Sequence, residues 1–295
     1  MMSKLKSLPD ALDGIEDGAT IGIGGWIFNS QPMALVRELI RRNKRNLRLV
    51  PAPGSIAPDM LIGAGCVAET GCVFISFEQF GLAPHFRRAA EAGSIKIHEL
   101  DGPAIAGGLR AAACDLPYGL IPDMCTDLPR VNPQTYQPVP HIPGERAMLK
   151  VPAIHLDVVL LHAQQADELG NVQYFGPVFF DVLMAQAAKK VIVSVDRIVP
   201  TEVVRRNNHL TKLPSAFVHS VVETPFGAHP TSSGGLYEAD DEHLAEYVRA
   251  SGGAASFTKY LETYVSGVAT HRDYHKRIGS PHLRQPELRE AANPQ

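Results

Sequence analysis

The sequence predicts an α/β protein with a single open, largely parallel sheet and helices on both of its faces. Short runs rich in β-branched residues alternate with helical patterns along the first half of the chain, and apolar runs typical of buried strands return in the second half. Strands that alternate with helices favour parallel pairing. With 295 residues, of which 45% are hydrophobic, the chain is long enough to bury a large core.

The expected elements follow this alternation in order. In the first half, strands are expected at 20–23, 47–50, 72–75 and 95–98, and helices at 32–42, 59–62, 84–92 and 102–114. In the second half, strands are expected at 157–162, 170–174, 191–195 and 217–222, and helices at 179–189, 237–250 and 256–264.

Two segments depart from this alternation. Residues 115–145 are rich in proline and lack periodicity, so a long ordered or semi-ordered loop is expected there. Residues 271–295 are rich in charge and proline, which is typical of a loosely ordered tail. We therefore expect one domain over residues 1–270, followed by this tail.

Charge and composition exclude several classes of function. The 28 basic and 31 acidic residues are interleaved along the chain, which argues against nucleic acid or an anionic membrane as a partner. No apolar stretch approaches the roughly 20 residues of a membrane span, and residues 1–9 lack the apolar segment of a secretion signal, so a cytoplasmic protein is expected. The four cysteines show no CxxC spacing, which favours buried thiols over a metal site.

Residues 17–32 carry the clearest chemical signal. The expected strand ends in Gly24 and Gly25, Trp26 follows, and Pro32 opens the next helix. Glycines let backbone N–H groups approach a ligand, and a helix N-terminus favours negative charge, so a phosphate, carboxylate or thioester oxygen fits there. A plain tight turn would explain the same glycines. A dinucleotide-binding motif is not indicated, because the glycines do not have GxGxxG spacing.

This segment resembles the N-terminal signature of family I coenzyme A transferases, with Asp-Gly, a short apolar strand, Gly-Gly-aromatic and a later proline. The family usually has Phe at Trp26 and Gly at Ser30. The 3-oxoacid branch carries an oxyanion-hole Asn where this chain has Ala34, which favours the glutaconate branch. Similarity to the A chain of that branch runs from about residue 17 to 264; further matches lie at 162–166, 170–172, 187–189, 202, 205–206, 225–230 and 235–237.

The resemblance implies a reaction and a partner. Family I enzymes attack an acyl-CoA thioester with a glutamate of the B subunit, in a Ser-Glu-Asn-Gly-like motif that is absent here. The chain is thus expected to be the A subunit of a heteromeric acyl-CoA:carboxylate CoA-transferase with ping-pong kinetics. CoA thioesters would be its substrates, no cofactor would be bound, and a homologous B subunit would complete a heterotetramer or larger assembly.

Candidate contacts with substrate or CoA lie in several segments. Gln164 and Gln165 follow a buried strand, where open α/β sheets bind ligands, although their amides could equally cap the turn. His229 could hydrogen-bond a substrate carboxylate or hold a loop, and a structural role is the commoner one. Glu78 is a weak candidate for a catalytic carboxylate, and no other catalytic residue is expected on this chain. The full set of binding candidates is Gly24, Gly25, Trp26, Ser30, Gln31, Ser76, Gln164, Gln165 and His229.

The acyl group and the reaction class remain open. The resemblance implies a dicarboxylic acyl group, but Trp26, Phe28, Phe77 and Phe80 could line a larger apolar pocket. The same pair of subunits resembles a ring-opening thioester hydrolase of steroid catabolism and a decarboxylase of glutaconyl-type thioesters. The hydrolase branch has an acidic residue where this chain has Gly102, and the decarboxylase interpretation requires a partner without the glutamate. A non-catalytic scaffolding subunit is the third alternative.

Overall fold

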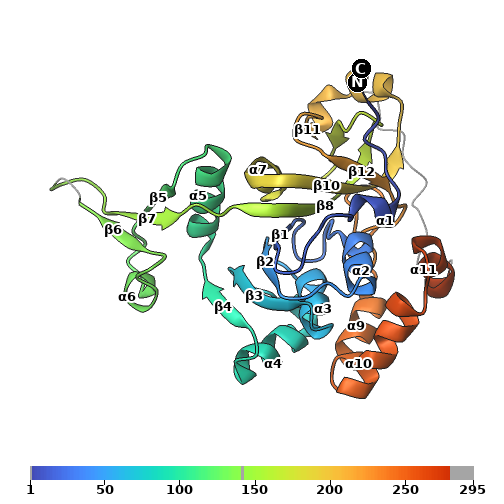
Figure 1. Cartoon of the computed structure of the whole chain (residues 1–295), viewed down its shortest axis with the longest axis horizontal. Coiled ribbons are helices and arrows are strands. Elements are labelled where there is room, and N and C mark those ends of the chain that lie inside the picture. Colours follow the sequence, from blue (N-terminus) through green and yellow to red (C-terminus); the bar gives the residue numbers. More distant parts are fainter. Residues whose placement is uncertain (1, 141–142, 280–295) are drawn as a thin grey trace.

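The computed structural model describes residues 2–140 and 143–279, and its main feature is one large, mostly parallel sheet (Figure 1). The parallel strands lie in the order β12, β10, β8, β1, β2, β3, β4. Their bounds are β1 Thr20–Ile23, β2 Leu47–Pro51, β3 Val67–Cys72, β4 Lys96–Glu99, β8 Leu156–Ala166, β10 Ala188–Ile198 and β12 Ser220–Glu223. Two short strands, β9 (Val172–Gln173) and β11 (Thr211–Leu213), extend the end of β8 as antiparallel pairs. The predicted fold class is confirmed.

Helices cover both faces of this sheet. One face carries α2, α3 and α10, and the other carries α5 and α7 (Figure 1). The bounds of the helices are α1 Leu8–Ala11, α2 Met33–Arg41, α3 Ile56–Gly63, α4 Pro84–Ala92, α5 Gly102–Ala113, α6 Leu128–Val131, α7 Asp181–Ala187, α8 Thr201–Arg206, α9 Asp241–Ala250, α10 Ala254–Leu261 and α11 His271–Ile278. Short 3-10 turns occupy Glu78–Phe80 and Asn208–Leu210, and a π-helical turn occupies Glu262–Ser266.

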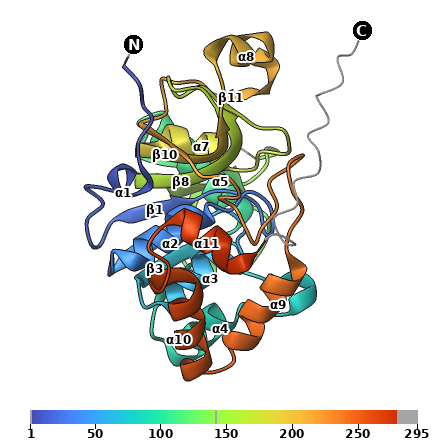
Figure 2. The ribbon, with the colours of Figure 1, turned by 90° about the vertical axis from the view of Figure 1, so that its right-hand side faces the viewer.

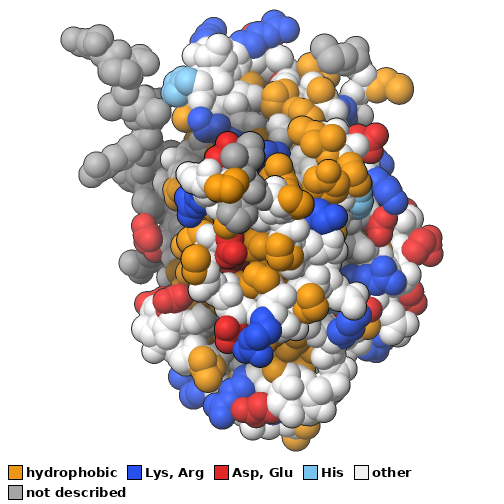
Figure 3. All heavy atoms as spheres, turned by 90° about the vertical axis from the view of Figure 1, so that its left-hand side faces the viewer, with side chains coloured by type: hydrophobic (Ala, Val, Ile, Leu, Met, Phe, Trp, Pro, Cys, Tyr) orange, Lys and Arg blue, Asp and Glu red, His pale blue; other side chains and the backbone are white. Residues whose placement is uncertain are grey.

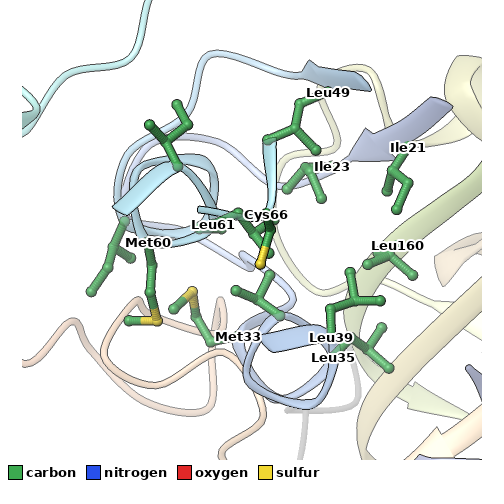
Figure 4. Close-up of a cluster of buried hydrophobic side chains, with 14 of the residues drawn as sticks. Ile21, Ile23, Met33, Leu35, Leu39, Leu49, Met60, Leu61, Cys66 and Leu160 are labelled. Carbon is green, nitrogen blue, oxygen red and sulfur yellow. The ribbon is translucent and has the colours of Figure 1, made fainter. Parts of the chain in front are cut away.

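The core follows from the alternation of side chains along the strands. Ile21 and Ile23 of β1 point to the face covered by α2, where they meet the buried side chains of Leu35 and Leu39 (Figure 4). On β8, Leu161 points to the opposite face and packs into the cluster beneath α5 and α7. Because β1 and β8 are adjacent and buried on both faces, they read in the sequence as nearly continuous apolar runs.

The predicted elements agree with the structure in order, but several ends differ. β8 and β10 each continue past the predicted ends at 162 and 195, because the polar residues that follow the apolar runs stay in the ladder; Gln165 is paired with Arg197. The helix predicted at 179–189 is shorter, and β10 begins directly after it at Ala188. The strand expected at 72–75 lies earlier, at Val67–Cys72. Apolar patterning detects burial, whereas a strand ends where backbone pairing ends.

The segment expected as a loop over 115–145 contains secondary structure instead, and it adds a small sheet to the predicted one. Strands β5 (Tyr118–Pro122), β6 (Gln137–Val139) and β7 (Met148–Pro152) form a second, antiparallel sheet that projects on the left in Figure 1. It packs on α5 through Gly119, where a Cβ atom would lie 2.3 Å from the carbonyl oxygen of Gly107. The two elements can approach this closely only because both positions are glycine. The pattern of apolar residues in the sequence does not indicate such a contact. Figure 3 shows apolar side chains gathered on this side of the molecule.

The chain after residue 270 also differs from the expected loose tail over its first eight residues. His271–Ile278 form α11, which begins with the Thr270 hydroxyl accepting from the Asp273 amide and lies against α2 (Figure 2). Tyr274 of this helix is 1% exposed, and the guanidinium of Arg37 lies 3.6 Å from the centre of its ring. Residues 280–295, the rest of the expected tail, lie outside the described residues. In the described ranges, no helix has the length and apolarity required to cross a bilayer.

Replacing Tyr274 with alanine tests whether α11 is part of the folded domain. Tyr274→Ala should lower the free energy of unfolding by about 3–5 kcal/mol, because it empties a packed site and uncovers the buried Arg37. Arg272→Ala, at an exposed position of the same helix, is the matched control and should change it little. Urea unfolding curves measure both. Equal midpoints for the two variants would mean that α11 is a loose tail after all.

Candidate functional site

The loops that follow β1, β2 and β3 meet at one edge of the main sheet, because parallel strands end on the same side. The Ile27 amide donates to the Pro53 carbonyl at 2.8 Å, and the Ser76 amide donates to the Gly54 carbonyl at 3.0 Å. These bonds join the loop at 24–31 to the loop after β2, and that loop to the segment after β3. Ligands of open α/β sheets bind at this carboxyl edge. We therefore take it as the candidate functional site.

Gly24 and Gly25 are required by the packing of this edge. A Cβ atom at Gly24 would lie 2.4 Å from Leu161 and 2.8 Å from a carboxylate oxygen of Asp181. Gly25 has φ +87°, and a Cβ atom there would meet the carbonyl oxygens of Asn29 and Ser30. The Gly24 amide donates to the Leu160 carbonyl, and the Gly25 amide donates to Asp181 at 2.9 Å. The amides expected to approach a ligand thus already have protein acceptors.

Four of the eight non-glycine residues with positive φ in the described part of the chain lie in loops at this edge. Ile27, Ser30 and Glu78 have φ values of +43°, +53° and +48°, and Phe226, in the loop after β12, has +55°. Left-handed backbone is unfavourable for residues with a Cβ atom, and most of all for a β-branched residue such as Ile27. Such strain is typical of functional sites. It supports a functional role for this edge.

Ser30, Gln31 and Gln164 lie together in the interior beneath the edge. The Gln164 amide donates to the hydroxyls of Ser233 (3.0 Å) and Ser30 (3.3 Å), and its oxygen accepts from the Phe175 amide. Gln31 accepts from the Ala57 amide at 2.8 Å. All three side chains are at most 4% exposed. They tie the loop after β1 to β8, α3 and the 231–233 segment; their expected contact with substrate stays a prediction.

Gln165 points to the opposite face of the sheet and holds Arg197. The Arg197 Nε–H donates to the Gln165 oxygen at 2.8 Å, while the Gln165 amide donates to Gln173 at 2.6 Å. The guanidinium lies 5.5 Å from the ring centre of Phe175, and burial lowers the pKa of Arg197. Sequence reasoning missed Arg197. The sequence feature that could have identified Arg197 is a basic residue two positions after the apolar run 191–195, where a strand ends.

His229 is enclosed by the protein. Its ring is hydrogen-bonded to the Tyr274 hydroxyl at 2.7 Å and to the Asp240 carboxylate at 2.9 Å, and its side chain is 2% exposed. Asp240 caps α9 and Tyr274 belongs to α11, so His229 joins these two helices to the loop after β12. The structural role considered for this residue is therefore well supported. Its expected contact with substrate stays a prediction.

Ser76 and Glu78 lie in the loop after β3. The Ser76 hydroxyl accepts from the Glu78 amide at 3.1 Å, and the Glu78 side chain is exposed. Phe77 between them is fully buried and stacks on Tyr247 with ring centres 5.5 Å apart. Phe77 therefore cannot line an acyl pocket in this arrangement, whereas Trp26 at 39% exposure is accessible. Phe28 and Phe80 are partly buried and contact each other.

Two buried aspartates at this edge were missed from the sequence. Asp196 accepts from the Phe226 amide at 2.8 Å and the Ser233 hydroxyl at 2.6 Å, and its carboxylate lies 3.1 Å from His162 Nε2. Asp181 is fully buried, and burial raises its pKa to about 6 although the Gly25 amide partly stabilises the anion. Both carboxylates are therefore committed to protein groups. An isolated Asp carries no sequence signal that marks it as buried.

One cavity lies away from this edge. It has a volume of about 220 Å³ and opens between the main sheet and the small sheet, where His98 Nε2 and the Glu69 carboxylate are hydrogen-bonded at 2.9 Å in its lining. None of the predicted site residues lines it. Across residues 2–140 and 143–279, no group of His, Cys, Asp and Glu side chains is arranged to hold a metal ion.

The raised pKa of Asp181 can be tested through pH-dependent stability. Its pKa of about 6 in the folded chain exceeds the ordinary value of 3.8, so the folded chain holds this proton more tightly than the unfolded chain does. Its ionisation therefore weakens the fold as pH rises from about 4 to about 7, by about 2–3 kcal/mol. Asp181→Asn keeps an oxygen for the Gly25 amide but cannot ionise. The stability of the variant relative to the natural chain should therefore rise by this amount between those pH values in urea unfolding; parallel pH profiles would contradict the assignment.

Comparison with known proteins places these features in a family. A family model described as Coenzyme A transferase matches residues 5–224. The cholesterol ring-cleaving hydrolase IpdA subunit of Rhodococcus jostii is 35% identical, over 88% of this chain and 91% of that protein. The A chain of glutaconate CoA-transferase from Acidaminococcus fermentans is 30% identical, over 96% and 94%. An uncharacterized protein of Archaeoglobus fulgidus is 32% identical over 95% of this chain, which spans only 63% of that relative's length.

Solved structures agree with the sequence comparisons. Glutaconate coenzyme A-transferase from Acidaminococcus fermentans matches with a TM-score of 0.88 at 28% identity, covering 95% of this chain and 94% of that chain. A variant of the decarboxylase AibA/AibB matches with a TM-score of 0.76 at 35% identity, covering 89% and 100%. The chain therefore belongs to the coenzyme A transferase family, and it is similar to chains that are named as A subunits.

Proposed function

We propose that this chain is the A subunit of a heteromeric enzyme that transfers CoA between carboxylic acids, and that the attacking glutamate belongs to a homologous B subunit. The observation that carries the proposal is the state of the carboxylates at the candidate site. Asp181 and Asp196 are buried and hydrogen-bonded, so neither can reach a thioester carbonyl in solvent. The loops at this edge are strained and depend on glycine, and neither of these two aspartates offers a free nucleophile.

The proposed reaction has two displacements. A carboxylate oxygen of the B-subunit glutamate attacks the acyl-CoA carbonyl, giving a mixed anhydride and releasing the CoA thiolate. The thiolate then attacks the glutamyl carbonyl, which forms a glutamyl-CoA thioester and releases the first carboxylic acid. A second acid reverses both steps and leaves as its CoA thioester. In this scheme, the present chain orients the acyl group and excludes water from the anhydride.

A thioester hydrolase is the second candidate, because a relative with this name is 35% identical. The position expected to be acidic in the hydrolase branch is Gly102 here, the first residue of α5. The neighbouring Asp101 carboxylate accepts from the Ala104 amide at 2.8 Å and from the Tyr136 hydroxyl at 3.2 Å. It serves as the cap of α5, and these bonds engage its Oδ1. This arrangement favours transfer over hydrolysis.

Intact-mass measurement of both polypeptides tests the proposal. The chain is co-expressed with the product of the neighbouring reading frame, and the complex is mixed with an acyl-CoA without an acceptor acid. A CoA adduct should appear on the partner and none on this chain. Continuous release of free CoA with no adduct would support the hydrolase, and release of CO₂ would support a decarboxylase. An adduct on this chain would overturn the proposal.

Glu78→Gln separates the weak nucleophile candidate from a loop residue. Glu78 is exposed and its backbone amide is held by Ser76, so the substitution should leave CoA transfer within an order of magnitude. Loss of an attacking carboxylate would instead lower turnover by several orders of magnitude. Steady-state transfer assays on the complex measure the difference. Lys259→Gln, on α10 far along the chain, is the control for a change of surface charge.

A further inference from the structure

Trp26 and Phe179 form a half-exposed aromatic pair at the carboxyl edge of the sheet. Their ring centres are 4.3 Å apart at an interplanar angle of 73°, and their side chains are 39% and 43% exposed. Large aromatic side chains gain most from burial, so an exposed pair at a ligand-binding edge points to a group that covers it. The sequence singled out Trp26 but not its partner.

The backbone segments that carry the two rings are joined through the same buried carboxylate. Gly25, next to Trp26, donates to Asp181, and Asp181 begins α7 two residues after Phe179. Trp26 is fixed further by reciprocal backbone bonds with Asn29, at 2.8 and 2.7 Å. The pair is therefore set in place before any ligand arrives, which reduces the entropy lost on binding.

The surroundings favour an uncharged ligand group. Asp181 lies directly beneath the Gly25 turn, and a second carboxylate brought against the rings would lose hydration near this acidic residue. A pair of rings is also far smaller than the roughly 800 Å² that each protein contributes to a typical stable interface. An aliphatic or alicyclic group matches both the size and the chemistry of the pair.

We propose that Trp26 and Phe179 form a subsite for an uncharged apolar acyl group, so that the enzyme prefers aliphatic or alicyclic acyl-CoA to dicarboxylic acyl-CoA. This inference rests on the proposed action on acyl-CoA thioesters. It adds Phe179 as a specificity residue and names the class of acyl group. It makes no assumption about which polypeptide carries the nucleophile.

Trp26 provides a direct readout, because it is the only tryptophan of the chain. Emission of the complex is recorded with Trp26 present and with Trp26→Phe, and the difference spectrum isolates Trp26 from the partner. Hexanoyl-CoA should shift this emission to shorter wavelength, whereas CoA and glutaryl-CoA should not. If none of these thioesters changes the emission, the subsite is wrong. A shift on adding the partner alone, with no further response to hexanoyl-CoA, would assign the pair to the interface between the two polypeptides and overturn the proposal.

Kinetics give a second, independent measurement. Phe179→Ala should lower the ratio of kcat/KM for hexanoyl-CoA over acetyl-CoA by about tenfold, as expected for lost contacts in an apolar pocket. Leu120→Ala, at an exposed apolar position of the small sheet, is the matched control and should leave the ratio unchanged. An unchanged ratio in Phe179→Ala would refute the specificity role. A failure to detect the glutamyl adduct while the emission shift persists would reject the transfer mechanism but not this subsite.

Discussion

A hydrogen bond from the Gly25 amide to the buried carboxylate of Asp181 joins the loop after β1 to the start of α7, across 156 positions of the chain. It forms because Gly24 has no side chain: a Cβ atom there would lie within 3 Å of both Leu161 and Asp181. The carboxylate in turn loses hydration, which raises its pKa to about 6. The position of the aromatic pair, and hence the shape of the edge, depends on this contact.

Most of the polar residues beneath the edge are hydrogen-bonded to other groups of the protein. Gln31 and Gln164 each accept a hydrogen bond from a backbone amide of another segment, and Asp196 accepts hydrogen bonds from two loops. A buried network in which the donors and acceptors are matched is rigid, and breaking one member leaves others unsatisfied. The network therefore gives the edge a fixed shape. A fixed edge of this kind is what the proposed positioning of an acyl group requires.

The two regions furthest from expectation, the small sheet and α11, share a physical reason. The small sheet depends on the contact between Gly119 and Gly107, and α11 depends on Tyr274 resting on Arg37. Each contact joins a segment rich in proline or charge to a helix with a buried apolar face, α5 or α2. Such a segment can be ordered when another part of the chain supplies the burial that its own local pattern does not indicate.

The sequence alone determined the parallel α/β class and the order of the parallel strands, because buried strands leave local patterns such as those around β1 and β8, and its motifs carried the resemblance to the family. It also located the loop with Gly24, Gly25 and Trp26. Only the tertiary structure decided what these residues contact: that Gln164 faces Ser233, that His229 holds Tyr274, and that Asp181 and Phe179 complete the edge. Contacts between residues far apart in the chain arise from packing, and the residue types alone do not encode which acceptor a given donor will meet.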